Sequence, residues 1–281
     1  MWAAAYRQRR YVYKMKIEKR IIATSHRDSH GEILHSDGLK DMVENIKEKY
    51  VRVGVEHDPR IPPLGRIVDA NIFKMEDGEY AVEAVMEIFE KDDLFIPIDN
   101  KKKMISHQNE LNHLLIRYDR SFREEDNLRI VNEIAGIFNS KPVEEVKKAL
   151  DPLSILIISG GFILTSIAAG FFGKFGSDLF DSFKNKLKQL YKRKSSQEQL
   201  LIFEFTIYSQ GNITVSIILT NPDDLVIDSF FSDGLNKLEK LLPHYFDHEF
   251  AISEIFLKYN NGKLEVTYGI RKDGIPIFPK K

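Results

Sequence analysis

Apolar and polar residues alternate along residues 16–150 in a pattern that predicts short strands and amphipathic helices. Within 36–50, for example, Leu39, Val43 and Ile46 recur at helical spacing and would share one face of a helix. The predicted helices cover 36–50, 124–138 and 142–150, and the predicted strands cover 16–25, 50–57 and two segments of 66–90 joined by a Glu-Asp-Gly turn. Because the strands follow one another through short turns, the region is predicted to be an α+β domain with mostly antiparallel pairing.

An uncharged run of 21 residues from Leu153 to Gly173 dominates the second region, residues 151–196. A helix of about 20 apolar residues can cross a bilayer, so the run predicts a transmembrane helix or, alternatively, a buried helical hairpin. Small side chains recur at every fourth position of this run, and on a helix they would allow a second helix to approach closely. They predict a homo-oligomer that forms through Gly161, Thr165, Ala169 and Gly173.

The rest of the second region predicts an amphipathic helix with a basic polar side. Apolar residues that include Phe183 and Leu187 line one face, and several lysines line the other. This pattern is typical of a helix that lies on an anionic membrane surface. Lysine and arginine are denser after the apolar run than before it, which favours association with the cytoplasmic side of a membrane. The alternative localisation is a soluble protein of the cytoplasm.

The third region, residues 197–281, predicts two hairpins that flank one helix, in the order ββαββ. A small sheet with one helix packed on it is the expected fold. His244 and His248 are four residues apart, but Pro243 interrupts the helix before them. Two histidines alone do not close a metal site, so they are interpreted as ordinary polar residues.

Composition narrows the chemistry. The chain has 281 residues, a formal net charge of −1 and no cysteine, which excludes disulfides, cysteine nucleophiles and thiolate metal sites. Residues 1–15 form a basic extension without an apolar stretch of signal-peptide length, and Met15 could be the natural start. Neither the charge nor the Lys101–Lys103 run, which lacks interleaved aromatic residues, indicates nucleic-acid binding.

Other polar clusters predict no cofactor and no metal. His26, His30 and His35 lie near Asp28 and Glu32, but their spacing matches no metal-binding template. They are interpreted as solvated turn residues. The glycines near the start of the uncharged run are not followed by the lysine that a phosphate-binding loop requires.

Three stretches of the first region occur in an order and spacing that resemble a known family. They are IIATSHRDSHGEILHSDGLK, VGVEHDPRIPPLGRIVDA and EDGEYAVEAVMEI. Together they resemble the phage HK97-type prohead maturation proteases, whose fold is shared with the herpesvirus assemblins. The resemblance covers about a quarter of the chain, residues 17–88. It implies an assemblin-like N-terminal domain at 16–150, followed by the hydrophobic segment and the ββαββ domain.

The resemblance implies serine hydrolysis, in which a histidine takes the proton of the attacking serine. His57, at the end of a predicted strand beside a proline-rich loop, would be the general base. Where the family has its serine, the apolar strand LLIRY of this chain has Leu115, which cannot attack a carbonyl. Ser106 and Ser121 are the two remaining candidates for the nucleophile.

Two functions follow from these features. The first is a serine-protease-like domain, active or catalytically degenerate, that a membrane or oligomerisation helix tethers in a phage-related or bacterial protein. Its partner would be a protein substrate. The alternative is a non-enzymatic, membrane-associated scaffold or effector that oligomerises and senses a protein partner.

Overall fold

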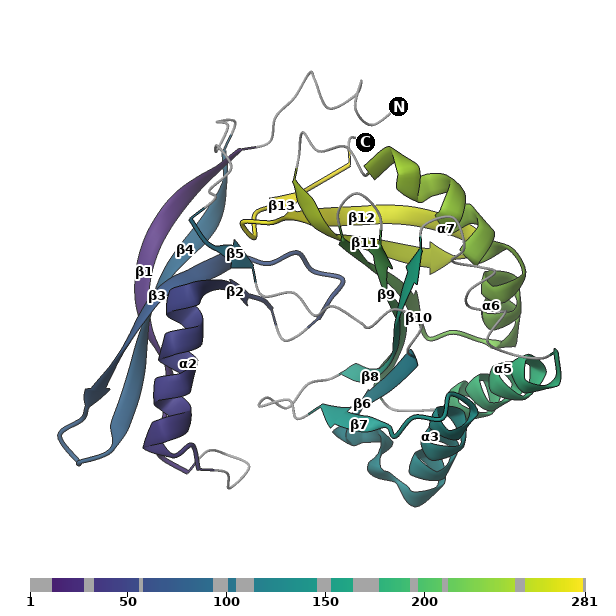
Figure 1. Cartoon of the computed structure of the whole chain (residues 1–281), viewed down its shortest axis with the longest axis horizontal. Helices are drawn as coiled ribbons and strands as arrows, with labels where there is room; N and C mark the ends of the chain where they lie inside the picture. Colours follow the sequence, from purple (N-terminus) through teal and green to yellow (C-terminus); the bar gives the residue numbers. More distant parts are fainter. Residues whose placement is uncertain are drawn as a thin grey trace. The chain divides into compact units, whose positions relative to one another are not determined.

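The computed structural model describes residues 12–27, 33–55, 58–92, 101–104, 114–145, 153–163, 177–192, 197–208, 212–245 and 251–279. Contacts divide the chain into two compact units. The N-terminal unit contains Ala3–Ser106 together with Ile270–Lys281, and the C-terminal unit is built from His107–Gly269. Both units combine helices with strands, which confirms the α+β class (Figure 1). The predicted boundaries at 150 and 196 differ from the division between these units.

The N-terminal unit is a five-stranded sheet with the order β1-β4-β3-β2-β5 (Figure 1). Its pairs are antiparallel except for β2 and β5, which run parallel. The strands are β1 (Val12–Thr24), β2 (Lys49–Val53), β3 (Gly65–Lys74), β4 (Tyr80–Asp92) and β5 (Lys103–Met104), and the helix is α2 (Ser36–Glu48). A tight turn joins β3 to β4, and Gly78 in this turn has a φ of +93°, which favours glycine.

Helix α2 covers one face of this sheet with the apolar stripe that the sequence predicts. Leu39, Val43 and Ile46 are buried against residues of β3 and β4, including Ala70 and Ala84. Small alanines on the strands let the helix approach closely, and the core therefore forms between one helix and the central strands.

The C-terminal unit is built on a larger mixed sheet, with the strand order β13-β12-β11-β10-β9-β8-β6-β7, in which the edge strand β13 (Pro276–Ile277) comes from the last residues of the chain. The pairs β6/β7, β8/β9 and β10/β11 are parallel, whereas β6/β8 and β9/β10 are antiparallel. The strands are β6 (Leu114–Asp119), β7 (Val143–Glu145), β8 (Leu153–Ile163), β9 (Glu198–Tyr208), β10 (Ile213–Thr220), β11 (Ile252–Asn260) and β12 (Lys263–Arg271).

Helices connect each pair of parallel strands and lie along one side of the sheet (Figure 1). They are η1 (Arg120–Arg123), α3 (Glu125–Ile137), α5 (Ser177–Tyr191), α6 (Asp224–Ser229), η3 (Phe230–Gly234), α7 (Leu235–Leu241) and η4 (Leu242–Tyr245). Aromatic rings join these layers. Phe203 of β9 stacks on Phe230 with ring centroids 4.6 Å apart, and Phe231 contacts both Phe203 and Phe183 of α5 edge-on.

The prediction of a membrane-spanning helix is wrong. Residues Leu153–Ile163 form strand β8, which pairs with β6 on one side and with β9 on the other. A strand buried on both faces has a continuous apolar run, and periodicity alone does not distinguish such a run from a buried helix. In the described part of the chain, no helix has both the length and the apolar character that crossing a bilayer requires.

The prediction of an oligomer that forms through the small-residue stripe required a continuous helix. Gly161 lies in β8 opposite Thr206 of β9, so it is part of a strand. Thr165, Ala169 and Gly173 lie outside the described residues.

The predicted amphipathic helix exists as α5, but its surroundings are protein. Phe183 and Leu187 are fully buried within the C-terminal unit. On the polar side, Lys184 and Lys188 lie 3.4 Å and 2.6 Å from carboxylate oxygens of Asp228. The basic residues therefore pair with an acidic residue of α6, and the membrane-surface prediction is wrong.

The predicted helix at 142–150 is also replaced by a strand where it is described. Val143–Glu145 form β7, the edge strand next to β6, and residues 146–150 lie outside the described residues. The strands and helices of the third region appear in the predicted order ββαββ, as β9, β10, the helical segment from α6 to η4, β11 and β12. They continue the sheet of the C-terminal unit.

Candidate functional site

Ser121, the one predicted nucleophile within the described residues, belongs to a hydrogen-bonded turn after β6. Its backbone N–H donates to the Asp119 Oδ1 over 2.9 Å, and its hydroxyl donates to the same oxygen. The other Asp119 oxygen accepts the backbone N–H of Ile155 at 2.5 Å. Ser121 thus lies in a turn whose first residue, Asp119, caps η1 and fastens it to β8.

His57 and Ser106 lie outside the described residues, so their distance to any nucleophile or base stays a prediction. Residues on either side of His57 form hydrogen bonds of their own. The N–H of Leu64 donates to the carbonyl of Val53 over 2.8 Å, and the Arg60 guanidinium forms a two-pronged ion pair with Asp58. These bonds agree with the stiff, proline-rich loop that the sequence indicates.

Asp119 is a buried carboxylate whose charge also influences the pKa of Tyr191. Its side chain sits at the end of β6, and burial together with the Asp119 charge raises the pKa of Tyr191 well above its ordinary value. The Tyr191 hydroxyl therefore keeps its proton, which it donates to the carbonyl of Leu200 over 3.0 Å. This bond fixes the end of α5 on β9.

The strand directions bring two chain segments to the same edge of the sheet. Strand β6 is antiparallel to β8, β8 is parallel to β9, and β9 is antiparallel to β10. Strands β6 and β10 consequently run in the same direction, and their carboxyl ends meet at one edge. In sheets with helical crossovers, this end of the strands is a frequent location of ligand sites.

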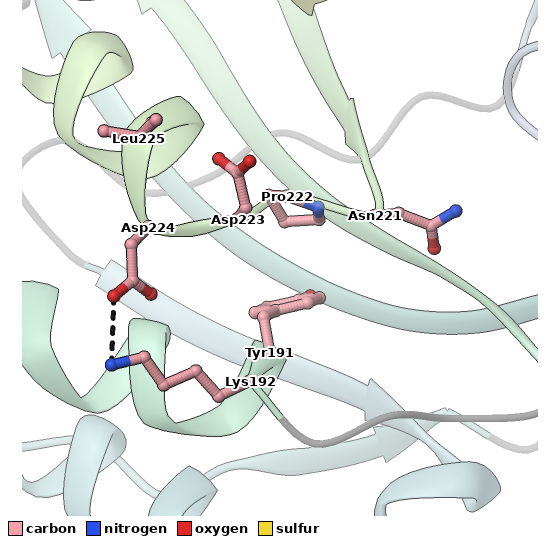
Figure 2. A pocket seen from close by; sticks show the side chains of 7 residues that line it. All are labelled: Tyr191, Lys192, Asn221, Pro222, Asp223, Asp224 and Leu225. Carbon is pink, nitrogen blue, oxygen red and sulfur yellow. Dashed lines mark ion pairs between the residues drawn. The ribbon is translucent and has the colours of Figure 1, made fainter.

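A pocket of about 410 Å³ opens at this edge, beyond the carboxyl end of β10 (Figure 2). Two segments line it, the last turn of α5 and the connection from β10 to α6. Its lining residues are Tyr191, Lys192, Asn221, Pro222, Asp223, Asp224 and Leu225.

Backbone geometry fixes the connection that forms one wall of this pocket. Asn221 has a φ of +45°, a left-handed conformation that asparagine tolerates better than most residues. Its backbone N–H and side-chain oxygen both bond to Gln199 at the start of β9, over 2.7 Å and 2.8 Å. Asp223 then caps α6 by accepting the N–H of Val226 over 2.8 Å. The wall is therefore formed before any ligand binds.

The charged groups of the pocket come from both segments. The Lys192 ammonium lies 3.0 Å from an Asp224 oxygen, as the dashed line in Figure 2 indicates, and Asp223 adds a second carboxylate. The lining thus has two carboxylates and one ammonium. Leu225 is 77% exposed at the rim, an apolar side chain that water surrounds.

Sequence interpretation treated Asn221–Asp224 only as a turn, and it missed this pocket. A signal was present, since an Asn-Pro-Asp-Asp segment between a buried strand and a helix is typical of a helix cap. Its opposite wall, Tyr191 and Lys192, lies some thirty residues earlier. Only the fold brings the two segments together.

The N-terminal unit contains a second polar cluster, centred on the buried guanidinium of Arg66. Arg66 is 2% exposed, donates to a Glu87 oxygen over 2.7 Å and lies over the Tyr50 ring, 4.0 Å from its centroid. It also donates to the backbone carbonyl of Asp273, and the Arg271 guanidinium binds the Asp273 carboxylate. The cluster joins residues 270–281 to the N-terminal sheet, which indicates a structural role.

A comparison with protein-family models, with curated proteins and with solved structures finds no match to this chain. In the described ranges, no group of three histidine or acidic side chains could hold a metal ion. The function must therefore be argued from the pocket and its lining.

Proposed function

We propose that the protein is a non-enzymatic binding protein that docks a basic segment of a partner protein in the pocket beyond β10. The observation that carries this proposal is the lining, which combines two carboxylates, a tyrosine ring and an exposed leucine around about 410 Å³. This function corresponds to the alternative of a non-enzymatic scaffold or effector that senses a protein partner, but it does not include membrane association.

The lining fits a cationic side chain. A guanidinium or ammonium group would approach Asp223 and Asp224. The two negative charges of these carboxylates outnumber the single positive charge of Lys192. An arginine of the partner could exchange with Lys192 for the Asp224 carboxylate without leaving that carboxylate unpaired.

The rim adds a preference for an apolar neighbour. Covering the side chain of Leu225 removes apolar surface from water, which is favourable in proportion to the covered area. A partner segment with an apolar residue next to an arginine would satisfy both the rim and the interior.

A blocked dipeptide tests the proposal. We expect N-acetyl-leucyl-arginine amide to bind the full chain with a dissociation constant of about 1 mM, equivalent to roughly −4 kcal/mol. Amide NMR spectra should change for residues at Tyr191, Lys192 and Asn221–Leu225. The Asp223→Asn variant keeps a good helix cap but loses one negative charge, and it should weaken binding about two- to fivefold.

Matched controls separate recognition from general effects. Leu225→Ala should weaken binding, whereas Leu179→Ala, which removes an exposed leucine on α5 outside the pocket, should not. N-acetyl-leucyl-glutamate amide should bind much more weakly than the arginine peptide. Equal binding of the two peptides, or spectral changes that avoid the pocket, would refute the proposal.

One observation keeps hydrolysis as a second candidate, the hydrogen bonding of the residues that flank His57. A general base must lie within hydrogen-bond reach of the proton that it takes, and the Asp58–Arg60 ion pair and the Val53–Leu64 hydrogen bond order the residues before and after it. If this candidate is correct, a fluorophosphonate probe will label a serine of the purified protein. His57→Ala should abolish the labelling. Absence of labelling in the unmodified protein would leave the binding function alone.

A further inference from the structure

Strand β1 is a long edge strand with an open side. Within the described part of the chain it pairs with β4 alone, across thirteen residues from Val12 to Thr24. Unpaired N–H and C=O groups along such an edge form a template on which another strand can pair.

The side chains of β1 have an unusual pattern on both faces. On one face, Ile17 and Ile21 are 69% and 55% exposed, and Lys19 lies between them with its ammonium 3.6 Å from a Glu83 oxygen. On the other face, Glu18 accepts hydrogen bonds from Lys16 and Arg20 over 2.9 Å and 2.7 Å. The edge thus alternates apolar positions with charges of both signs.

We propose that β1 pairs with β1 of a second copy of this chain, antiparallel, with the twofold axis at Lys19. In this register Ile17 lies opposite Ile21 of the partner subunit, and Glu18 lies opposite Arg20 of the partner subunit. Symmetry repeats both pairs. Residues directly opposite each other in an antiparallel ladder point to the same face, so each pair makes side-chain contact.

Charge and shape select this register over its neighbours. An axis at Glu18 would put two carboxylates together and bring Lys16 opposite Arg20 of the partner subunit, which is repulsive. An axis at Ile17 would pair that residue with itself but would bring Arg20 opposite Lys14 of the partner subunit, which is repulsive. The register shift between Ile21 and Ala23 also ends the regular ladder close to residue 22.

The two lysines that meet at the axis do not repel each other strongly. Each is accompanied by Glu83 of its own chain, so the centre of the interface holds two positive and two negative charges. Charged edge residues commonly prevent strand pairing. Here their order makes the edge complementary to itself, which favours one closed dimer over open aggregation.

Charge reversal tests the pairing in solution. We expect the full chain to sediment as a dimer, and Glu18→Arg to weaken the dimer by roughly tenfold or more because it creates two like-charged pairs. The double variant Glu18→Arg with Arg20→Glu restores opposite charges in both pairs, and it should dimerise like the unmodified protein. Thermal unfolding at high dilution provides the check that each variant is folded.

Disulfide cross-linking tests the register. The sequence has no cysteine, so only the introduced cysteine can form a disulfide. In Lys19→Cys the two thiols would face each other across the axis, and oxidation should produce a covalent dimer. In Ile17→Cys the two thiols would be four residues apart along the ladder, about 13 Å, which is too far for a disulfide. This inference does not depend on the pocket, because β1 belongs to the N-terminal unit.

Three results would overturn the inference. The first is a protein that stays monomeric at every concentration. The second is a dimer that Glu18→Arg leaves intact. The third is efficient cross-linking of Ile17→Cys in place of Lys19→Cys, which would demonstrate a different register.

Discussion

Replacement of Arg66 by alanine is expected to lower the free energy of unfolding of the N-terminal unit by about 3–5 kcal/mol. The Arg66 side chain is almost completely buried, and its removal would leave the Glu87 carboxylate and the Asp273 carbonyl without their guanidinium partner. It would also remove the cation from the Tyr50 ring. Breaking one side of a buried ion pair costs far more than the pair itself contributes.

Hydrogen exchange of β3 and β4, measured together with denaturant unfolding by circular dichroism, checks this prediction. Lys40→Ala is a matched control, because it removes a cation of the same unit whose ion pair with Asp37 is exposed. It should cost at most about 1 kcal/mol. Arg66→Lys keeps the charge but loses the planar fork, and we expect an intermediate loss. An Arg66→Ala protein as stable as Lys40→Ala would contradict the structural role of the cluster.

Replacement of Asp119 by alanine is expected to destabilise the C-terminal unit by about 3 kcal/mol. The carboxylate accepts two backbone N–H groups, of Ser121 and Ile155, and the Ser121 hydroxyl. Its removal would leave the buried N–H of Ile155 without a partner and would release the turn from β8. Unfolding in urea, followed by circular dichroism, measures the loss.

Ser121→Ala provides the control for this prediction. It removes only one of the three bonds to Asp119 and should cost about 1 kcal/mol. If Ser121 were a nucleophile, its replacement would change reactivity toward a fluorophosphonate while hardly changing stability. A loss of stability as large as that of Asp119→Ala would show that the hydroxyl, and not the carboxylate, organises the turn.

Local patterns were sufficient to predict α2 and four of the five strands of the N-terminal sheet, but not the order of the strands. The strands β3 and β4 alternate buried and exposed residues around a turn with an obligatory glycine, and α2 has one apolar face. Each of these signals comes from neighbouring residues. Strand β8 lacks such a signal, because both of its faces are covered and its apolar run is continuous. Length then suggested a transmembrane helix, which the pairing of β8 with two strands contradicts.

Interactions between distant residues account for what the sequence did not reveal. The helical period of α5 was recognised, but its lysines pair with Asp228, some forty residues later, instead of lipid. Arg66 lies 207 residues before Asp273, the carbonyl of which it binds. Ser121 was identified as a candidate, but its position in the sequence does not show that its hydroxyl binds Asp119. Contacts of this kind have no periodicity that composition or spacing could expose.

The return of residues 270–281 to the N-terminal unit has a consequence for biosynthesis. Residues 3–106 leave the ribosome long before Asp273 is synthesised. Arg66 therefore cannot bind the Asp273 carbonyl until the whole C-terminal unit has been translated. During that interval the five strands of the N-terminal sheet are available, but the Arg66 guanidinium lacks the Asp273 carbonyl that it binds in the complete protein. The first unit to be synthesised is therefore the last to be completed.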